Sequence, residues 1–107
     1  MPRQGDLTGV PLPETVKELD FDQVCSTFHT TPDFIIELIS YGTIEPQGTS
    51  STTWRFNTQQ LKIIRTAMHL HHDLEVNHAG IALAVDLLEQ LNQLQVELDI
   101  LHKYFER

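Results

Sequence analysis

The chain has 107 residues, a formal net charge of −8 and 40% hydrophobic residues. This length allows one domain, or a small domain with an appended helix. Only seven residues are Lys or Arg, which argues against a surface that binds nucleic-acid phosphates, because such binding uses cations to replace condensed counterions. The segment from Glu14 to Glu45 contains seven acidic residues and one basic residue, Lys17. We expect this half of the chain to attract a basic partner.

The sequence divides into three expected parts. Residues 1–18 are predicted to form a flexible arm, because Met1 to Pro13 hold three of the five Pro and two of the five Gly without apolar periodicity. Residues 19–76 are expected to form a compact domain and residues 77–107 a long helix. No segment resembles a signal peptide, a membrane span or a lipidation site, so we expect a cytoplasmic protein.

Two short helices are predicted after a possible strand or lead-in at Thr15–Phe21. The first covers Gln23–Phe28, with an Asp side chain at position 20 or 22 accepting a hydrogen bond from its first turn. The second runs from Pro32 to about Ser40, because Thr31 is a good N-cap and proline fits the first helical position. Two short helices joined by a three-residue turn form a helix-turn-helix.

The second predicted helix has two unlike faces. Its apolar face consists of Phe34, Ile35, Leu38 and Ile39. The opposite face presents Ile36 between the carboxylates of Asp33 and Glu37, an arrangement that suits an apolar anchor in a partner-binding surface. Two alternatives remain. In the first, Ile36 is only an exposed aliphatic side chain without a partner-binding role. In the second, Asp33 serves only as a favourable charge near the helix N-terminus.

A wing is predicted next. Two extended arms, Thr43–Gln47 and Trp54–Phe56, flank a polar tip at residues 48–53, which is typical of a hairpin. We expect the two aromatic side chains of the second arm to pin the wing to the core rather than to stack on a ligand. Asn57 followed by Gln60 forms a capping-box pattern, so a third helix is predicted from there to about Asp73.

The longest predicted helix begins at Asn77, a plausible N-cap, and reaches Phe105. It would be about 42 Å long, whereas a compact domain of this size has a radius of gyration of roughly 13 Å. Its heptad positions are apolar throughout, and the first half is expected to pack on its own domain. Four leucines in the second half are expected to form a homodimer interface: Leu91, Leu94, Leu98 and Leu101.

Other chemistry is not indicated. His69, His71, His72 and Asp73 lie close in sequence, but a tetrahedral metal site needs ligands that this spacing does not supply. We expect no metal, no cofactor and no enzymatic activity, because no catalytic motif is present. Cys25 is expected to be a buried structural thiol. Protonation of all six His would change the net charge from −8 to −2, so binding to a basic partner should weaken toward about pH 5.5.

The order of these elements resembles a known family. The helix-turn-helix is followed by "YGTIEPQ", a wing that ends in "WRF", a helix capped by Asn57, and the run "HHDLEVNHAGIALAVDLLEQL". Together they resemble the MerR-like winged helix-turn-helix and, more narrowly, the chaperone-modulator CbpM family. The resemblance covers roughly Leu19 to Phe105. It implies a mainly α fold with a small β wing and a long C-terminal dimerisation helix, paired antiparallel.

The resemblance also implies a function. MerR-like proteins usually bind DNA through basic side chains on the second helix and the wing. Here the second helix has Asp33 and Glu37 and no Lys or Arg, and the wing offers only Arg55. CbpM-like proteins instead bind and inhibit a DnaJ-like co-chaperone of the CbpA type through its J-domain, whose DnaK-binding helix is basic. We therefore expect a non-catalytic regulator. The alternatives are a MerR-like DNA-binding transcriptional regulator and a dimeric scaffold with an unrelated partner.

Overall fold

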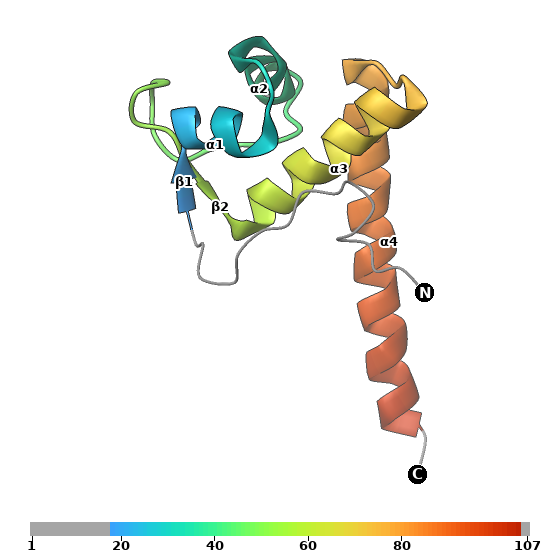
Figure 1. Cartoon of the computed structure of the whole chain (residues 1–107). Helices are drawn as coiled ribbons and strands as arrows, with labels where there is room; N and C mark the ends of the chain where they lie inside the picture. The colour runs from blue at the N-terminus through green and yellow to red at the C-terminus, as the bar shows by residue number, and fades with distance from the viewer. Residues whose placement is uncertain (1–17, 106–107) are drawn as a thin grey trace.

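A computed structural model of the chain describes residues 18–105. The fold is mainly α, as predicted, and Figure 1 shows a compact group of elements from which one long helix extends. In chain order the elements are β1 (Glu18–Asp20), α1 (Phe21–Phe28), α2 (Pro32–Ser40), β2 (Arg55–Asn57), α3 (Thr58–Leu74) and α4 (His78–Phe105). The predicted N-terminal arm lies outside the described residues, except for Glu18.

The helix-turn-helix forms through local hydrogen bonds. Asp20 Oδ1 accepts a hydrogen bond from the Gln23 amide at 2.8 Å, and Gln23 Oε1 accepts one from the Asp20 amide at 2.8 Å. This reciprocal cap starts α1 at Phe21, two residues before the predicted start. The hydroxyl of Thr31 caps α2 by accepting from the Phe34 amide at 3.3 Å, and α2 has the predicted bounds.

The small sheet pairs segments that are distant in sequence. β1 and β2 are antiparallel, with Leu19 opposite Phe56. The predicted hairpin between the two arms of the wing is reduced to one bridge, in which Gln47 and Arg55 exchange backbone hydrogen bonds of 3.1 and 2.9 Å. Pro46 has no N–H with which to extend this pairing. The second arm therefore pairs mainly with β1, and Arg55 Nε lies 3.2 Å from Glu18 Oε1 across the sheet.

The core lies where α1, α2, the wing, α3 and the first turns of α4 meet. Its buried side chains are Val24, Phe28, Phe34, Ile35, Leu38, Ile44, Phe56, Leu61, Ile64, Ala67, Ile81 and Val85. Trp54 packs edge-on against Phe21 and Phe56, with ring centroids 5.3 and 6.3 Å apart. These contacts confirm that the two aromatic residues pin the wing to the core.

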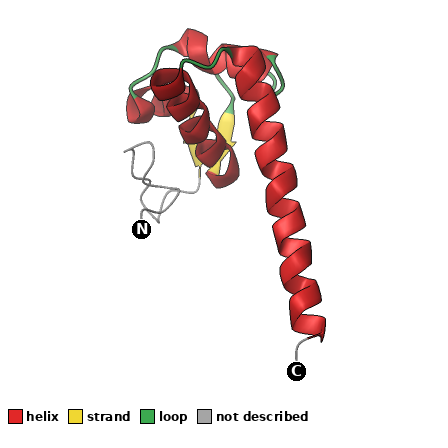
Figure 2. Ribbon diagram, turned by 90° about the vertical axis from the view of Figure 1, so that its right-hand side faces the viewer, coloured by secondary structure: helices red, strands yellow, loops and turns green. Residues whose placement is uncertain are grey.

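The last helix leaves the domain after its first turns, as Figure 2 shows from the side. The Asn77 side chain accepts a hydrogen bond from the Gly80 amide at 2.8 Å, so it caps α4 as predicted. Ile81 and Val85 are buried against the domain, whereas Leu88 is exposed. None of the helices described combines the length and the apolar content needed to traverse a bilayer.

Candidate partner-binding site

The outward face of α2 has the composition that the sequence predicted. Asp33, Ile36 and Glu37 are all exposed, and 39% of Ile36 is accessible to solvent. The opposite face places Phe34 and Ile35 in the core, so the orientation of α2 is fixed by burial. An aliphatic side chain between two solvent-exposed carboxylates suits contact with a surface that is apolar at its centre and basic at its edges.

The charged residues in the segment that contains α2 are all acidic. Residues 18–45 contain six Asp or Glu and no Lys or Arg. Asp33 lies in the first turn of α2, where the helix dipole also stabilises it, in line with the alternative considered above. In the wing, the Arg55 guanidinium lies beside the Glu18 carboxylate. This surface therefore opposes phosphate binding, which depends on uncompensated cations.

One contact of the site was not anticipated from the sequence. Oε2 of Glu37 lies 3.4 Å from Nε2 of His78, the first residue of α4, whose side chain is only 13% exposed. The His78 ring packs against Phe34 and Tyr41, with centroids 5.0 and 5.8 Å apart. No local pattern reveals this contact, because it joins two helices that are far apart in sequence.

Three histidines lie near the C-terminal end of α3, and two of them make polar contacts. His69 Nδ1 lies 2.7 Å from Asp73 Oδ2 one helical turn away, and His71 Nδ1 lies 3.1 Å from the Val76 carbonyl oxygen. His71 also stacks against His78, with centroids 5.8 Å apart. Within residues 18–105, no group of three His, Cys, Asp or Glu side chains is arranged to hold a metal ion.

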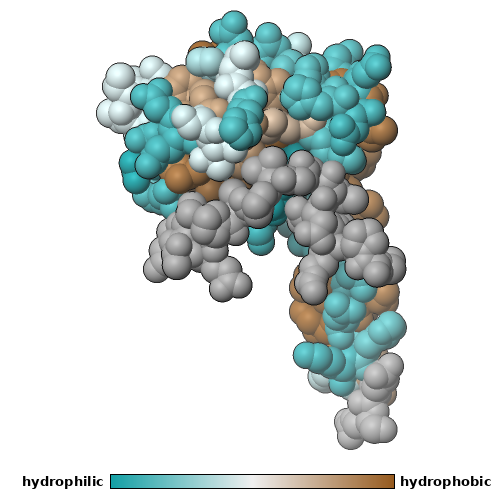
Figure 3. Space-filling view, in the orientation of Figure 1, coloured by the Kyte–Doolittle hydropathy of each residue, from teal (hydrophilic) through white to brown (hydrophobic). Residues whose placement is uncertain are grey.

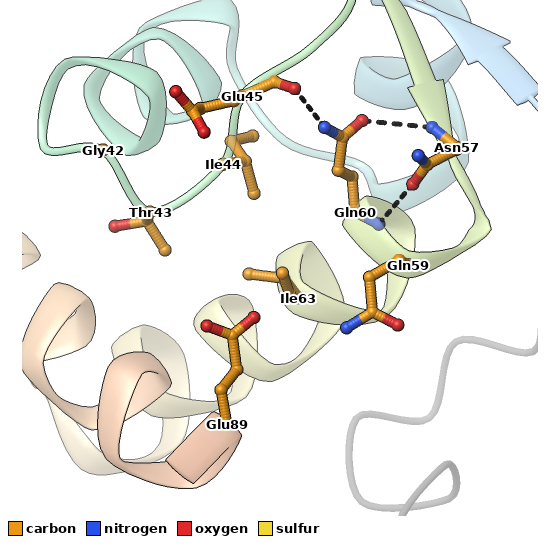
Figure 4. Close-up of a pocket in the computed structure, with 9 residues that line it drawn as sticks. All are labelled: Gly42, Thr43, Ile44, Glu45, Asn57, Gln59, Gln60, Ile63 and Glu89. Carbon is orange, nitrogen blue, oxygen red and sulfur yellow. Dashed lines mark hydrogen bonds between the residues drawn. The ribbon is translucent and has the colours of Figure 1, made fainter. Parts of the chain in front are cut away.

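A shallow polar pocket of about 300 Å³ lies between the α2 exit, the start of α3 and α4 (Figure 4). Gln60 organises its upper edge, because its amide nitrogen donates to the Glu45 carbonyl and its amide oxygen accepts from Asn57 N at 3.1 Å. The side chain of Glu89 points into this space. The lining residues are Gly42, Thr43, Ile44, Glu45, Asn57, Gln59, Gln60, Ile63 and Glu89. This set contains two carboxylates and no cation, so the pocket too is unsuited to an anion.

The leucines predicted for dimerisation are all exposed. Leu91, Leu94, Leu98 and Leu101 each show between 46% and 61% of their surface. At 100° per residue, Leu94 lies half a turn around the helix from Val85, so this row points away from its own domain. Figure 3 shows hydrophobic surface along the part of α4 that extends below the domain. Leu74, the last residue of α3, is also exposed.

Cys25 differs slightly from its prediction. The side chain packs at the edge of the core but is only half-buried. Burial, and then the neighbouring Asp22 carboxylate, raise the pKa of the Cys25 thiol. Both effects disfavour the reactive thiolate, so the residue has the properties of a structural rather than a nucleophilic cysteine.

The helix-turn-helix, the wing and the long terminal helix define a winged helix-turn-helix protein of the MerR type. Residues 19–103 match the family described as MerR HTH family regulatory protein. More specifically, the chain is 35% identical over 91 residues to the chaperone modulatory protein CbpM of Coxiella burnetii, covering 85% of this chain and 86% of the relative.

Two further relatives carry the same name. The chaperone modulatory protein CbpM of Pseudomonas putida (strain GB-1) is 34% identical over 88 residues, covering 82% of this chain and 87% of the relative. That of Pseudomonas entomophila is 33% identical over 86 residues, covering 80% and 85%. The chain belongs to the CbpM family of chaperone modulatory proteins, which confirms the resemblance seen in the sequence.

Proposed function

We propose that this chain is a cytoplasmic, non-catalytic regulator that binds the J-domain of a DnaJ-like co-chaperone of the CbpA type and inhibits it. Its relatives are named chaperone modulatory proteins, which supports a chaperone as the target. The observation that carries the proposal is the exposed face of α2, where Asp33 and Glu37 flank Ile36. This face complements a basic helix with an apolar stripe.

The two kinds of side chain have different tasks in the proposed complex. The carboxylates attract the basic partner from a distance and orient it, which mainly increases association rate and selectivity. Ile36 supplies the contact that excludes water at the centre, where most binding energy concentrates. The bound protein covers the J-domain helix that engages DnaK, so inhibition is competitive.

The proposed regulator acts as a homodimer. Leu91, Leu94, Leu98 and Leu101 form a continuous exposed row beyond the domain, and a second copy of α4 is the surface that matches its heptad spacing. The family resemblance favours antiparallel pairing, which relates the two copies by a twofold axis. The dimer then presents two α2 faces.

Isothermal titration of the full chain with an isolated J-domain tests the proposal. Asp33→Asn combined with Glu37→Gln removes two charges from the α2 face and is expected to weaken binding at least tenfold, about 1.4 kcal/mol. Glu97→Gln combined with Asp99→Asn removes the same charge from the end of α4 and serves as the matched control. Equal affinities of the two double variants would argue against the α2 face.

A DNA-shift experiment at low salt distinguishes the proposed function from the alternative of a DNA-binding transcriptional regulator. A MerR-like transcriptional regulator would bind DNA tightly under these conditions, with an affinity that falls steeply as salt increases. The proposal predicts J-domain binding and no DNA shift. The reverse result would establish the DNA-binding regulator, and failure to bind either ligand would leave the dimeric scaffold.

A further inference from the structure

One exposed aromatic side chain lies beside the partner face of α2. Tyr41, the C-cap of α2, is 51% exposed, whereas every other Phe, Tyr or Trp of residues 18–103 is at least partly buried. Tyr41 follows Glu37 by four residues, which places it about 40° further around the helix, on the same side. The acidic face of α2 therefore continues into an exposed aromatic ring.

We propose that Tyr41 is a further residue of the partner-binding surface. The ring face turned away from His78 binds a Lys or Arg side chain of the basic partner, and the Glu37 carboxylate, one helical turn back, supplies the opposite charge. This inference rests on the proposed function. It adds a contact for a cation to the apolar contact made by Ile36.

Contacts on one side of the ring hold it in place. His78 stacks on Tyr41 with centroids 5.8 Å apart and an angle of 20° between the ring planes. The His78 side chain is only 13% exposed, and its ring packs in turn against Phe34 at 5.0 Å and His71 at 5.8 Å. A ring stacked on a packed neighbour has little freedom left to lose, so binding spends less free energy on ordering it.

The backbone at the end of α2 restrains Tyr41 as well. Its amide donates to the Glu37 carbonyl at 3.0 Å, and the amides of the next two residues donate to α2 carbonyls at 3.0 and 2.9 Å. Gly42 has a φ of +75°, the left-handed conformation that commonly ends a helix. Tyr41 is therefore attached to a closed, hydrogen-bonded turn.

The charge around the ring favours a cation. The face of an aromatic ring carries negative potential and attracts a Lys or Arg group that lies within about 6 Å of its centroid. Glu37 Oε2 lies 3.4 Å from Nε2 of His78, the ring on which Tyr41 stacks, so a carboxylate is close to the stacked pair. Residues 18–45 contain no Lys or Arg, so this segment offers the ring no cation of its own. A basic side chain of the partner can contact the ring and the carboxylate together.

The test compares variants of Tyr41 by isothermal titration with the isolated J-domain. Tyr41→Phe keeps the aromatic face, whereas Tyr41→Leu keeps an apolar side chain without one. The Kd of Tyr41→Leu should be at least about threefold higher than that of Tyr41→Phe. Tyr104→Leu makes a matched exchange at the exposed end of α4 and should bind like the wild type. Equal Kd values for the folded Phe and Leu variants would overturn the inference.

A measurement on the unsubstituted chain does not depend on whether the variants fold. The ring proton signals of Tyr41 should shift in nuclear magnetic resonance spectra when the J-domain binds, and those of Tyr104 should not. Unchanged Tyr41 ring signals at saturating J-domain would overturn the inference. If the Asp33→Asn, Glu37→Gln double variant binds weakly while the two Tyr41 variants bind equally, only this inference fails. Absence of wild-type binding would contradict the proposed function, and this inference with it.

Discussion

Leu19 lies directly opposite Phe56 in the antiparallel pair of β1 and β2. The aromatic side chain is fully buried, and Leu19 packs against the same core. Phe56 is also the residue before the Asn57 cap of α3. One short pairing therefore joins the beginning of the domain, the end of the wing and the start of α3.

Phe56→Ala should destabilise the domain severely. The substitution leaves a cavity among α1, β1 and α3, and loss of a buried phenylalanine typically costs about 3–5 kcal/mol. Urea unfolding monitored by circular dichroism measures the change. Gln59 is the exposed second residue of α3. Gln59→Ala should therefore change the free energy of unfolding by no more than about 0.5 kcal/mol. Similar midpoints for both variants would show that the wing is not anchored by Phe56.

Ile36→Glu should separate binding from folding. Ile36 is 39% exposed, so a charged side chain reaches water and the melting temperature should change little. Binding to the J-domain should weaken at least tenfold, about 1.4 kcal/mol, because a carboxylate replaces the apolar contact. Gln93→Glu adds the same charge on α4 and is the control. A marked drop in melting temperature would identify Ile36 as a core residue.

Leu94→Glu or Leu98→Glu should convert the proposed dimer into a monomer. Burying an unpaired carboxylate in a leucine seam costs several kcal/mol, more than a short helix pair readily tolerates. Sedimentation equilibrium gives the mass of each variant. Gln93→Glu, on another side of α4, should remain dimeric. A monomeric wild-type protein would contradict dimerisation through this row.

Cys25 should react slowly with alkylating reagents near neutral pH. Burial and the Asp22 carboxylate raise the pKa of its thiol, so the thiolate fraction is low and grows only as the pH increases. Asp22→Asn removes the smaller contribution and should speed alkylation at pH 8 by less than about tenfold, since one pKa unit is a factor of ten. A slower reaction in this variant would contradict the assigned effect of Asp22.

Local signals made much of this structure predictable from sequence. The Thr31–Pro32 start of α2 and the caps at Asn57 and Asn77 act over a few residues, and each lies where predicted. The exposed face of α2 followed from helical periodicity. Pairings between distant segments were not predicted, because β1 with β2 and Glu37 with His78 depend on how complete helices pack.

The most direct test of the central claim is a titration of the isotope-labelled full chain with an unlabelled J-domain, followed by nuclear magnetic resonance. We predict that the amide signals of Asp33, Ile36 and Glu37 shift or broaden first, while those from Leu91 to Leu101 change little. Changes confined to the wing tip at residues 48–53, or no change at saturating J-domain, would contradict a partner site on the acidic face of α2.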